Sequence, residues 1–259
     1  FYTFHWYSQR DREGRMQLLL GRGNREEGPV IASLRVAGIY ISEYRDLRRK
    51  RQWSFKDPMN PAFAGSCDGY GTLTDGTRFI LEVKTANRKN FRKFQKKGVL
   101  LANAKYFGQA QSYMRWSLAG DNPVDRTLFV IVQKDDDQRH YEWVKYDPAF
   151  ARELAIKADR VLNASGPSEL LRLANDPSYY ECSYCDHRAV CHESAAPAKN
   201  CRTCKYVEMK QFPISGRVSW RCRCKEGIRS NTQLSLADAR LGCEKWEVGN
   251  EDFSRRGTG

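Results

Sequence analysis

Long apolar stretches are missing from this 259-residue sequence. No apolar run approaches the roughly 20 residues that a membrane-spanning helix needs, no signal peptide is visible and no internal repeat stands out. Hydrophobic residues still make up 41% of the chain and aromatic residues 12%, which is enough to build a core. We therefore expect a soluble cytoplasmic protein without a membrane partner, formed by one well-buried domain and a small appendage.

Cysteine is scarce over most of the chain, and acidic residues are fewer than basic ones. Cys67 is the only cysteine before Cys182, whereas eight of the nine lie between Cys182 and Cys243. That clustering, with repeated Cys-x-x-Cys spacing, favours metal binding in a reducing compartment over a disulfide framework. The 31 acidic residues are outnumbered by 44 basic ones, which gives a net charge of +13. The excess predicts a polyanionic partner, with nucleic acid first, although a merely basic surface is the alternative.

The hydrophobic pattern predicts an α/β domain with a mixed sheet flanked by helices. Asp75-Gly76 supplies a hairpin turn, and Asp147 caps a helix that begins at Pro148. The expected helices cover 25–36, 99–118 and 148–163, and the expected strands cover 38–44, 66–73, 78–83, 127–132 and 140–146, with 45–63 irregular. This domain would occupy 1–177, followed by a small Cys-rich metal-binding lobe over 178–250 and a flexible tail over 251–259.

Three charged side chains on the predicted hairpin carry the strongest chemical signal. Glu82 and Lys84 are two residues apart and so share one face of a strand, and Asp68 can lie opposite them on the other strand. Glu82 is embedded in an otherwise apolar segment, where an isolated charge is costly. A surface salt bridge is the alternative interpretation. Two carboxylates and a lysine suit Mg²⁺-dependent phosphodiester hydrolysis.

Four motifs in this order resemble the PD-(D/E)XK nuclease superfamily, in particular its RecB-like branch and the related phage exonucleases. The resemblance covers roughly residues 23–191. Each motif is weak alone, but together they are quite specific. The motifs are Gly23-Asn-Arg-Glu-Glu27, Gly65-Ser-Cys-Asp68-Gly, Glu82-Val-Lys84-Thr and Gln109-Ala-Gln-Ser-Tyr113.

The resemblance implies a role for each matching residue. Asp68, Glu82 and the carbonyl of Val83 would bind catalytic Mg²⁺ or Mn²⁺, and Lys84 would position or activate the attacking water. Glu27 would support the metal site from the first helix, with Glu26 as the alternative. Gln109 and Tyr113 match an element that orients DNA and the lysine. Asn24 stands where many RecB-like members have histidine, which puts the geometry of a second metal ion in doubt.

The function implied by the resemblance is a metal-dependent deoxyribonuclease. Exonucleolytic processing of phage or mobile-element DNA during recombination is the first expectation, in a bacterial or phage-infected cell and with a recombination or replication protein as a possible partner. A structure-specific endonuclease and a non-catalytic DNA-binding scaffold are the alternatives.

Two basic runs suggest contacts with DNA phosphates. The first contains Arg48, Arg49, Lys50 and Arg51, and the second contains Arg88, Lys89, Arg92 and Lys93. Phe91 lies within the second run and could stack on a base. Solvated loops are the alternative for both runs.

The C-terminal cysteines predict two metal sites. The preferred zinc set is Cys201, Cys204, Cys222 and Cys243. The second site would use Cys182, Cys185 and Cys191 with Cys224, His192 or His187. Its spacing resembles the iron–sulfur cysteines of some RecB-like and CRISPR-adaptation nucleases, so a [4Fe–4S] cluster is the alternative to zinc there. Those families take a further cysteine from upstream of the nuclease core, and no cysteine precedes Cys67 here.

Overall fold

Two compact units make up the chain, one formed by Arg12–Ile156 and the other by Phe1–Asp11 together with Lys157–Gly259. The computed structural model describes residues 6–8, 14–60, 63–164, 166–211 and 218–249. The boundary expected after residue 177 lies inside the second unit, and the beginning of the chain also belongs to that unit. The tail expected over 251–259 lies outside the described residues. No helix in the described parts of the chain is long and apolar enough to cross a membrane.

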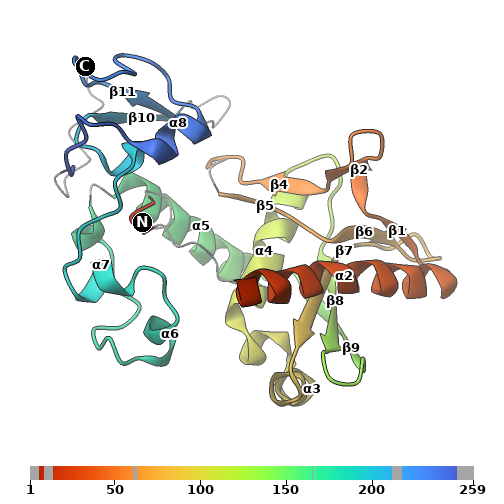
Figure 1. Ribbon diagram of the computed structural model, residues 1–259. Coiled ribbons are helices and arrows are strands. Elements are labelled where there is room, and N and C mark those ends of the chain that lie inside the picture. Colours follow the sequence, from red (N-terminus) through yellow and green to blue (C-terminus); the bar gives the residue numbers. More distant parts are fainter. Residues whose placement is uncertain (1–5, 9–13, 61–62, 165, 212–217, 250–259) are drawn as a thin grey trace. The chain divides into compact units, whose positions relative to one another are not determined.

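A five-stranded mixed sheet forms the centre of the first unit, in the order β1-β6-β7-β8-β9 (Figure 1). β7 and β8 run parallel, and the other neighbouring pairs are antiparallel. The strands are β1 (Tyr40–Ser42), β6 (Gly69–Thr72), β7 (Arg78–Ala86), β8 (Arg126–Gln133) and β9 (Arg139–Lys145). The mixed sheet and its β6–β7 hairpin are therefore as the sequence predicts.

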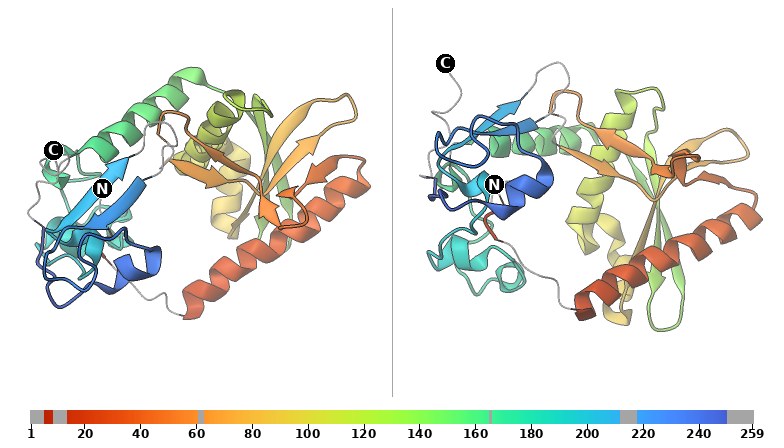
Figure 2. Two further views of the ribbon diagram at one scale, coloured as in Figure 1. Left: turned by 90° about the horizontal axis from the view of Figure 1, so that it is seen from above. Right: turned by 45° about the horizontal axis from the view of Figure 1, so that its top comes forward.

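Helices cover both faces of this sheet. Figure 2 shows α2 on one side of the strands and α3 and α4 on the other. The helices of this part of the chain are α2 (Gly14–Val36), α3 (Arg88–Ala102), α4 (Ala104–Leu118) and α5 (Pro148–Asn163). The expected capping of α5 is present, because the Asp147 carboxylate accepts the N–H groups of Ala149 and Phe150, each at 3.0 Å.

The central strand β7 separates two hydrophobic cores by the alternation of its side chains. Phe79, Leu81 and Val83 pack in the core that α2 covers. Ile80 and Ala86 belong to the core beneath α3 and α4. Because alternate residues of a strand face the same side, Glu82 and Lys84 share the second face. Glu82 and Lys84 thus lie on the same face of β7 as the buried apolar residues Ile80 and Ala86.

Residues 45–63, expected to be irregular, contain short strands instead. They form two-stranded pairs, β2 with β3 and β4 with β5. Their bounds are β2 (Tyr44–Asp46), β3 (Arg51–Gln52), β4 (Ser54–Lys56) and β5 (Ala64–Ser66). Strands of two or three residues are too short to show a period of two against a basic background, so the pattern missed them.

The helix expected over 99–118 is divided in two, and a basic helical segment that begins at Arg88 precedes it. α3 already begins at Arg88, Gly98 adopts φ 70°, and Asn103 ends α3 and caps α4 by accepting the N–H of Lys105 at 3.1 Å. Both carboxylate oxygens of Glu142 accept the Val99 N–H, at 2.8 and 2.9 Å. Glycine fits the positive φ at this break without steric cost.

Gly71→Ala is expected to destabilise the first unit by about 1–3 kcal/mol, because it overpacks a filled core. A Cβ on Gly71 would lie 2.1 Å from the Phe79 ring, which pairs across the β6–β7 hairpin and is fully buried. Thermal denaturation would measure the loss. Gly23→Ala is the matched control, because a Cβ there meets nothing within 4 Å and alanine favours the helix. Equal melting temperatures for Gly71→Ala and the wild type would contradict the packing argument.

The second unit contains a short antiparallel hairpin and several single turns. Its elements are η1 (Pro167–Glu169), α6 (Tyr180–Ser183), α7 (Arg188–His192), η2 (Cys201–Thr203), β10 (Val207–Gln211), β11 (Val218–Cys222) and α8 (Leu236–Leu241). Its core includes Val207, Trp220 and Leu234 together with three cysteines. It is small for an independent core.

The second unit also holds residues from the beginning of the chain. The Asn200 amide donates to the Trp6 carbonyl at 2.9 Å, and the Ala198 N–H donates to the Tyr7 carbonyl at 2.8 Å. The Arg202 guanidinium lies 3.6 Å from the centroid of the Trp6 ring and 4.9 Å from that of Trp220. These contacts explain why the first residues belong to this unit. Sequence reasoning gave no sign of them.

Candidate active site

Asp68 is fixed at the start of β6 by the neighbouring strand. Its Oδ2 accepts the backbone N–H of Val83 at 2.7 Å, which ties it to the centre of β7. Its side chain is only 17% exposed. The hairpin register therefore brings Asp68 beside the strand that carries Glu82 and Lys84, as the sequence predicts.

Glu82 and Lys84 lie side by side in the interior. Lys84 Nζ is 2.5 Å from Glu82 Oε2 and 3.9 Å from Asp68 Oδ2. Glu82 is fully buried, and among the described residues its Oε1 has no hydrogen-bond partner. A buried carboxylate with one unsatisfied oxygen is costly unless something else binds there. This cost argues against a simple surface salt bridge.

Glu27 joins this group from α2. Its carboxylate interacts electrostatically with Asp68 and Lys84, and also with Glu43. Glu26, the alternative, lies 3.8 Å from Arg22 in an ion pair one helical turn away. The structure therefore brings Glu27, rather than Glu26, to the charged centre.

Burial dominates the electrostatics of these carboxylates. It raises the pKa of Glu82 to about 8 and the pKa of Glu27 to about 7, with neighbouring carboxylates adding to both shifts and Lys84 opposing them. Burial also raises the pKa of Asp68, against Lys84 and the Val83 N–H. For Lys84, burial favours the neutral amine, but Glu82 and Asp68 outweigh it and raise the pKa. Lys84 is thus an ammonium group at neutral pH.

Gln109 and Tyr113 support the segment that precedes Asp68. Gln109 Nε2 donates to the Tyr113 hydroxyl at 2.8 Å, and that hydroxyl donates to the Ser66 carbonyl at 2.7 Å. Tyr113 is 5% exposed, and a Cβ on Gly65 would lie 2.6 Å from its ring. Burial raises the pKa of Tyr113 to about 12, so the hydroxyl keeps its proton. In this position Tyr113 contacts the chain beside Asp68.

Sequence reasoning missed Tyr106 on the same helix. Lys84 Nζ lies 5.6 Å from the centroid of the Tyr106 ring, within the range of a cation–π contact. Tyr106 and Tyr113 are seven residues apart in α4, which places them on one helix face. That spacing was the available signal.

The oxygen-rich centre fits a hard divalent cation better than a soft one. Mg²⁺ and Mn²⁺ prefer carboxylate and water oxygens, and Mg²⁺ commonly uses only one or two carboxylates beside waters and substrate phosphate. The unpartnered Oε1 of Glu82 and the neighbouring Asp68 suit that mode of binding. In the described parts of the chain, no three His, Cys, Asp or Glu side chains already stand as a closed metal site. The role of the Val83 carbonyl stays a prediction.

The two basic runs differ in local structure but share exposure. Arg48, Arg49 and Lys50 are exposed in the turn between β2 and β3, and Arg51 is exposed at the first position of β3. In the second run the exposed residues are Arg88, Lys89, Arg92 and Lys93, on α3, which begins two residues after β7 ends. Lys93 Nζ donates to the Ala102 carbonyl at 2.8 Å, so part of that run also stabilises its own helix.

The prediction that Phe91 stacks on a base is wrong. Phe91 is 1% exposed and packs in the core beneath α3 and α4 with Met114. Phe94 is likewise buried, at 5% exposure. The run is an amphipathic helix, and its aromatic residues form the apolar face that docks on the sheet.

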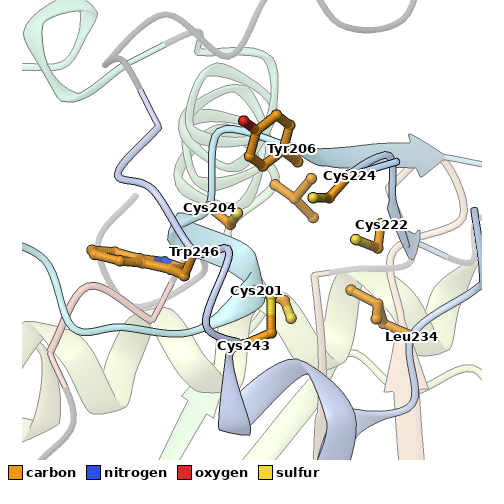
Figure 3. A pocket seen from close by; sticks show the side chains of 9 residues that line it. Cys201, Cys204, Tyr206, Cys222, Cys224, Leu234, Cys243 and Trp246 are labelled. Carbon is orange, nitrogen blue, oxygen red and sulfur yellow. The ribbon is translucent and has the colours of Figure 1, made fainter. Parts of the chain in front are cut away.

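The cysteines of the second unit gather differently from the expected pairing. Cys224 lines one cavity with Cys201, Cys204, Cys222 and Cys243, instead of joining the earlier group (Figure 3). In the earlier group, Cys182 Sγ lies 3.7 Å from His192 Nε2, and Cys185 is exposed while Cys191 is partly buried. None of the nine cysteines, all of which lie in described parts of the chain, forms a disulfide.

Comparisons with known proteins give a partial structural match and no named function. No family model matches the sequence, and no curated protein matches it. A solved structure described as "Crystal structure of SSO0001" matches 51% of this chain at 16% identity, with a TM-score of 0.33. The match covers 52% of that protein, so it spans about half the length of each chain.

Proposed function

We propose that this chain is a divalent-metal-dependent deoxyribonuclease of the PD-(D/E)XK type. The observation that carries the proposal is the convergence of Glu27, Asp68, Glu82 and Lys84 on one centre, with Lys84 within 4 Å of two carboxylates. The β1-β6-β7-β8-β9 sheet with its single parallel pair is the arrangement expected of a restriction-endonuclease-like core. The motif order of the sequence supports the same reading.

Asp68 and Glu82 are the residues that would hold Mg²⁺ or Mn²⁺. The metal, when bound, supplies Lewis acidity toward the phosphate and lowers the pKa of the attacking water. Glu82 can offer its unpartnered Oε1 while Oε2 stays on Lys84. The Val83 N–H fixes Asp68 Oδ2 and leaves the other carboxylate oxygen to face the ligand.

Lys84 would act as a cation in the reaction. Its raised pKa keeps the proton on Nζ, so it can orient a water molecule and offset charge on the phosphate as the pentavalent transition state forms. In hydrolysis the water oxygen bonds to phosphorus, the phosphorus–oxygen bond of the leaving strand breaks, and the leaving oxygen takes up a proton. Glu27, whose pKa is raised to about 7, would take up the proton that the attacking water releases and pass it to solvent.

The exposed basic residues would bind the DNA backbone. Arg88 follows Lys84 by four residues, so its Cα lies within about 13 Å of that of Lys84. Phosphates flanking the cleaved bond are therefore within reach of the start of α3. This surface supplies affinity without sequence preference.

The test is cleavage of end-labelled linear DNA and of closed circular DNA, with Mg²⁺ or Mn²⁺, by the wild type and by Glu82→Ala. We expect the wild type to cleave. The cleavage rate of Glu82→Ala should be lower than that of the wild type by at least about 1000-fold, since the variant lacks a metal ligand. Glu153→Ala, at an exposed position of α5, is the matched control and should cleave like the wild type.

Four outcomes are informative. Loss of linear DNA alone supports an exonuclease, and nicking of circles supports an endonuclease with the same centre. If the wild type binds DNA but cleaves neither form with either metal, the enzyme proposal is overturned in favour of a binding scaffold. Equal activity of Glu82→Ala would also overturn it.

A further inference from the structure

A cavity in the second unit is lined largely by cysteine. Five cysteines surround it together with Tyr206, Val207, Leu234 and Trp246. Figure 3 shows the five side chains arranged around one space, on segments that are far apart in the sequence. They are Cys201, Cys204, Cys222, Cys224 and Cys243. The nuclease proposal makes no use of this cluster.

Three separate pieces of backbone deliver these thiols. Cys201 and Cys204 bracket the η2 turn, which Asn200 caps, and the Cys204 N–H donates to the Cys201 carbonyl at 3.3 Å. Cys222 ends β11, where it pairs with Val207 of β10. A two-residue knuckle and a strand end are common ways to present zinc ligands.

Cys243 reaches the same place through a tight approach of the backbone. Gly242, at φ 63°, ends α8, and a Cβ on it would lie 3.5 Å from the Asn200 Cα. The chain therefore passes directly beside the η2 turn just before Cys243. This contact brings Cys243 to the turn that carries Cys201 and Cys204.

The cluster is too cysteine-rich to be an ordinary apolar core. Cysteines account for three members of the buried core, with Val207, Trp220, Leu234 and Ala239 as the others. Cys201, Cys204, Cys222 and Cys224 are all less than 9% exposed, and none of them forms a disulfide. A lobe with so few large apolar side chains usually needs a metal or disulfides to be stable.

We propose that this lobe binds one Zn²⁺ through the thiolates of Cys201, Cys204, Cys222 and Cys243. Cys224 also lines the cavity, but we assign it to the turn that follows β11, where the Gly227 N–H donates to the Cys224 carbonyl at 3.4 Å. Among the described residues the sulfur atoms do not yet stand at ligand positions. Binding therefore requires them to converge to about 2.3 Å from the metal, with release of the thiol protons.

The first test is the metal content of the whole chain, purified without chelators from zinc-supplemented cells. We expect about one zinc per chain by elemental analysis. Cys201→Ser, Cys204→Ser, Cys222→Ser and Cys243→Ser should each retain less than a tenth of that amount, whereas Cys224→Ser should retain all of it. Replacement of zinc by Co²⁺ should give the charge-transfer absorption of a thiolate-bound tetrahedral ion.

A second measurement protects the test against variants that fail to fold. Adding a zinc-selective chelator to the wild type should change the fluorescence of Trp220 and Trp246, and Zn²⁺ but not Mg²⁺ should restore it. Zinc-free wild-type protein, a thiol count that reveals disulfides, or iron in this lobe would overturn the proposal. Loss of zinc in Cys224→Ser with retention in Cys222→Ser would overturn the ligand set. Glu82→Ala should keep its zinc whatever its activity.

Discussion

Lys84→Ala is expected to lower the rate of DNA cleavage by roughly 100- to 1000-fold, the loss typical of removing one preorganised electrostatic group. Lys84 Nζ touches Glu82 and lies 3.9 Å from Asp68, so its charge is held where negative charge develops on the phosphate. The substitution leaves both carboxylates in place. The rate of cleavage should therefore fall. The affinity for Mg²⁺ should not fall, because the positive charge that competed for the carboxylates is gone.

Single-turnover cleavage and Mg²⁺-dependent thermal shifts would separate these two effects. Lys157→Ala, at an exposed position of α5, is the matched control. Lys84→Arg should restore part of the rate, since it restores the charge but not the geometry. If Lys84→Ala cleaves at the wild-type rate, Lys84 does not take part in the reaction.

Glu82→Gln is expected to remove a pH dependence of stability from the metal-free protein. The pKa of Glu82 is raised from 4.5 to about 8, so the folded state holds a proton that the unfolded state releases between those values. The stability that this proton supplies is complete below pH 4.5 and is lost as pH rises through about 8. Over this window the free energy of unfolding falls by on the order of 1 kcal/mol per pH unit. Glutamine stays neutral and avoids the loss.

Chemical denaturation in EDTA at pH 6 and at pH 9 would measure this difference. The variant should be more stable than the wild type at pH 9 by a few kcal/mol, on the order of the pKa shift converted to free energy. Mg²⁺ should stabilise the wild type at pH 9 and leave the variant nearly unchanged, because it binds the ionised carboxylate of the native state. Glu153→Gln is the control. Parallel pH profiles for wild type and Glu82→Gln would show that Glu82 is ionised throughout.

The parts of the fold that the sequence predicted are those with strong local signals. Asp75-Gly76 and the alternation along 66–83 are sufficient for the β6–β7 hairpin, and that hairpin alone brings Asp68 beside Glu82 and Lys84. Glu27 comes from α2, so its place follows from the resemblance and the tertiary packing rather than from spacing. The charged centre was thus largely readable in advance.

The missed features depend on packing between distant segments. Phe91 looked like a base-stacking residue because its charged neighbours concealed the helical period that buries it. Cys224 was one of three candidates for the fourth ligand of the earlier cysteine group, because spacing cannot show that the chain beyond β11 keeps Cys222 and Cys224 at one cavity. The strands of 44–66 are too short to carry a period.

The contacts of Trp6 determine the order in which the molecule can be assembled. The hydrogen bond between Asn200 and the Trp6 carbonyl joins residues 194 positions apart, whereas the first unit is one continuous segment. During synthesis the α/β unit leaves the ribosome complete and can fold at once. The cysteine lobe has to wait until Asn200 and the cysteines after it have emerged, and only then can it bind Trp6. A bulky fusion placed directly before Trp6 would therefore impair the metal-binding lobe before it affected the charged centre.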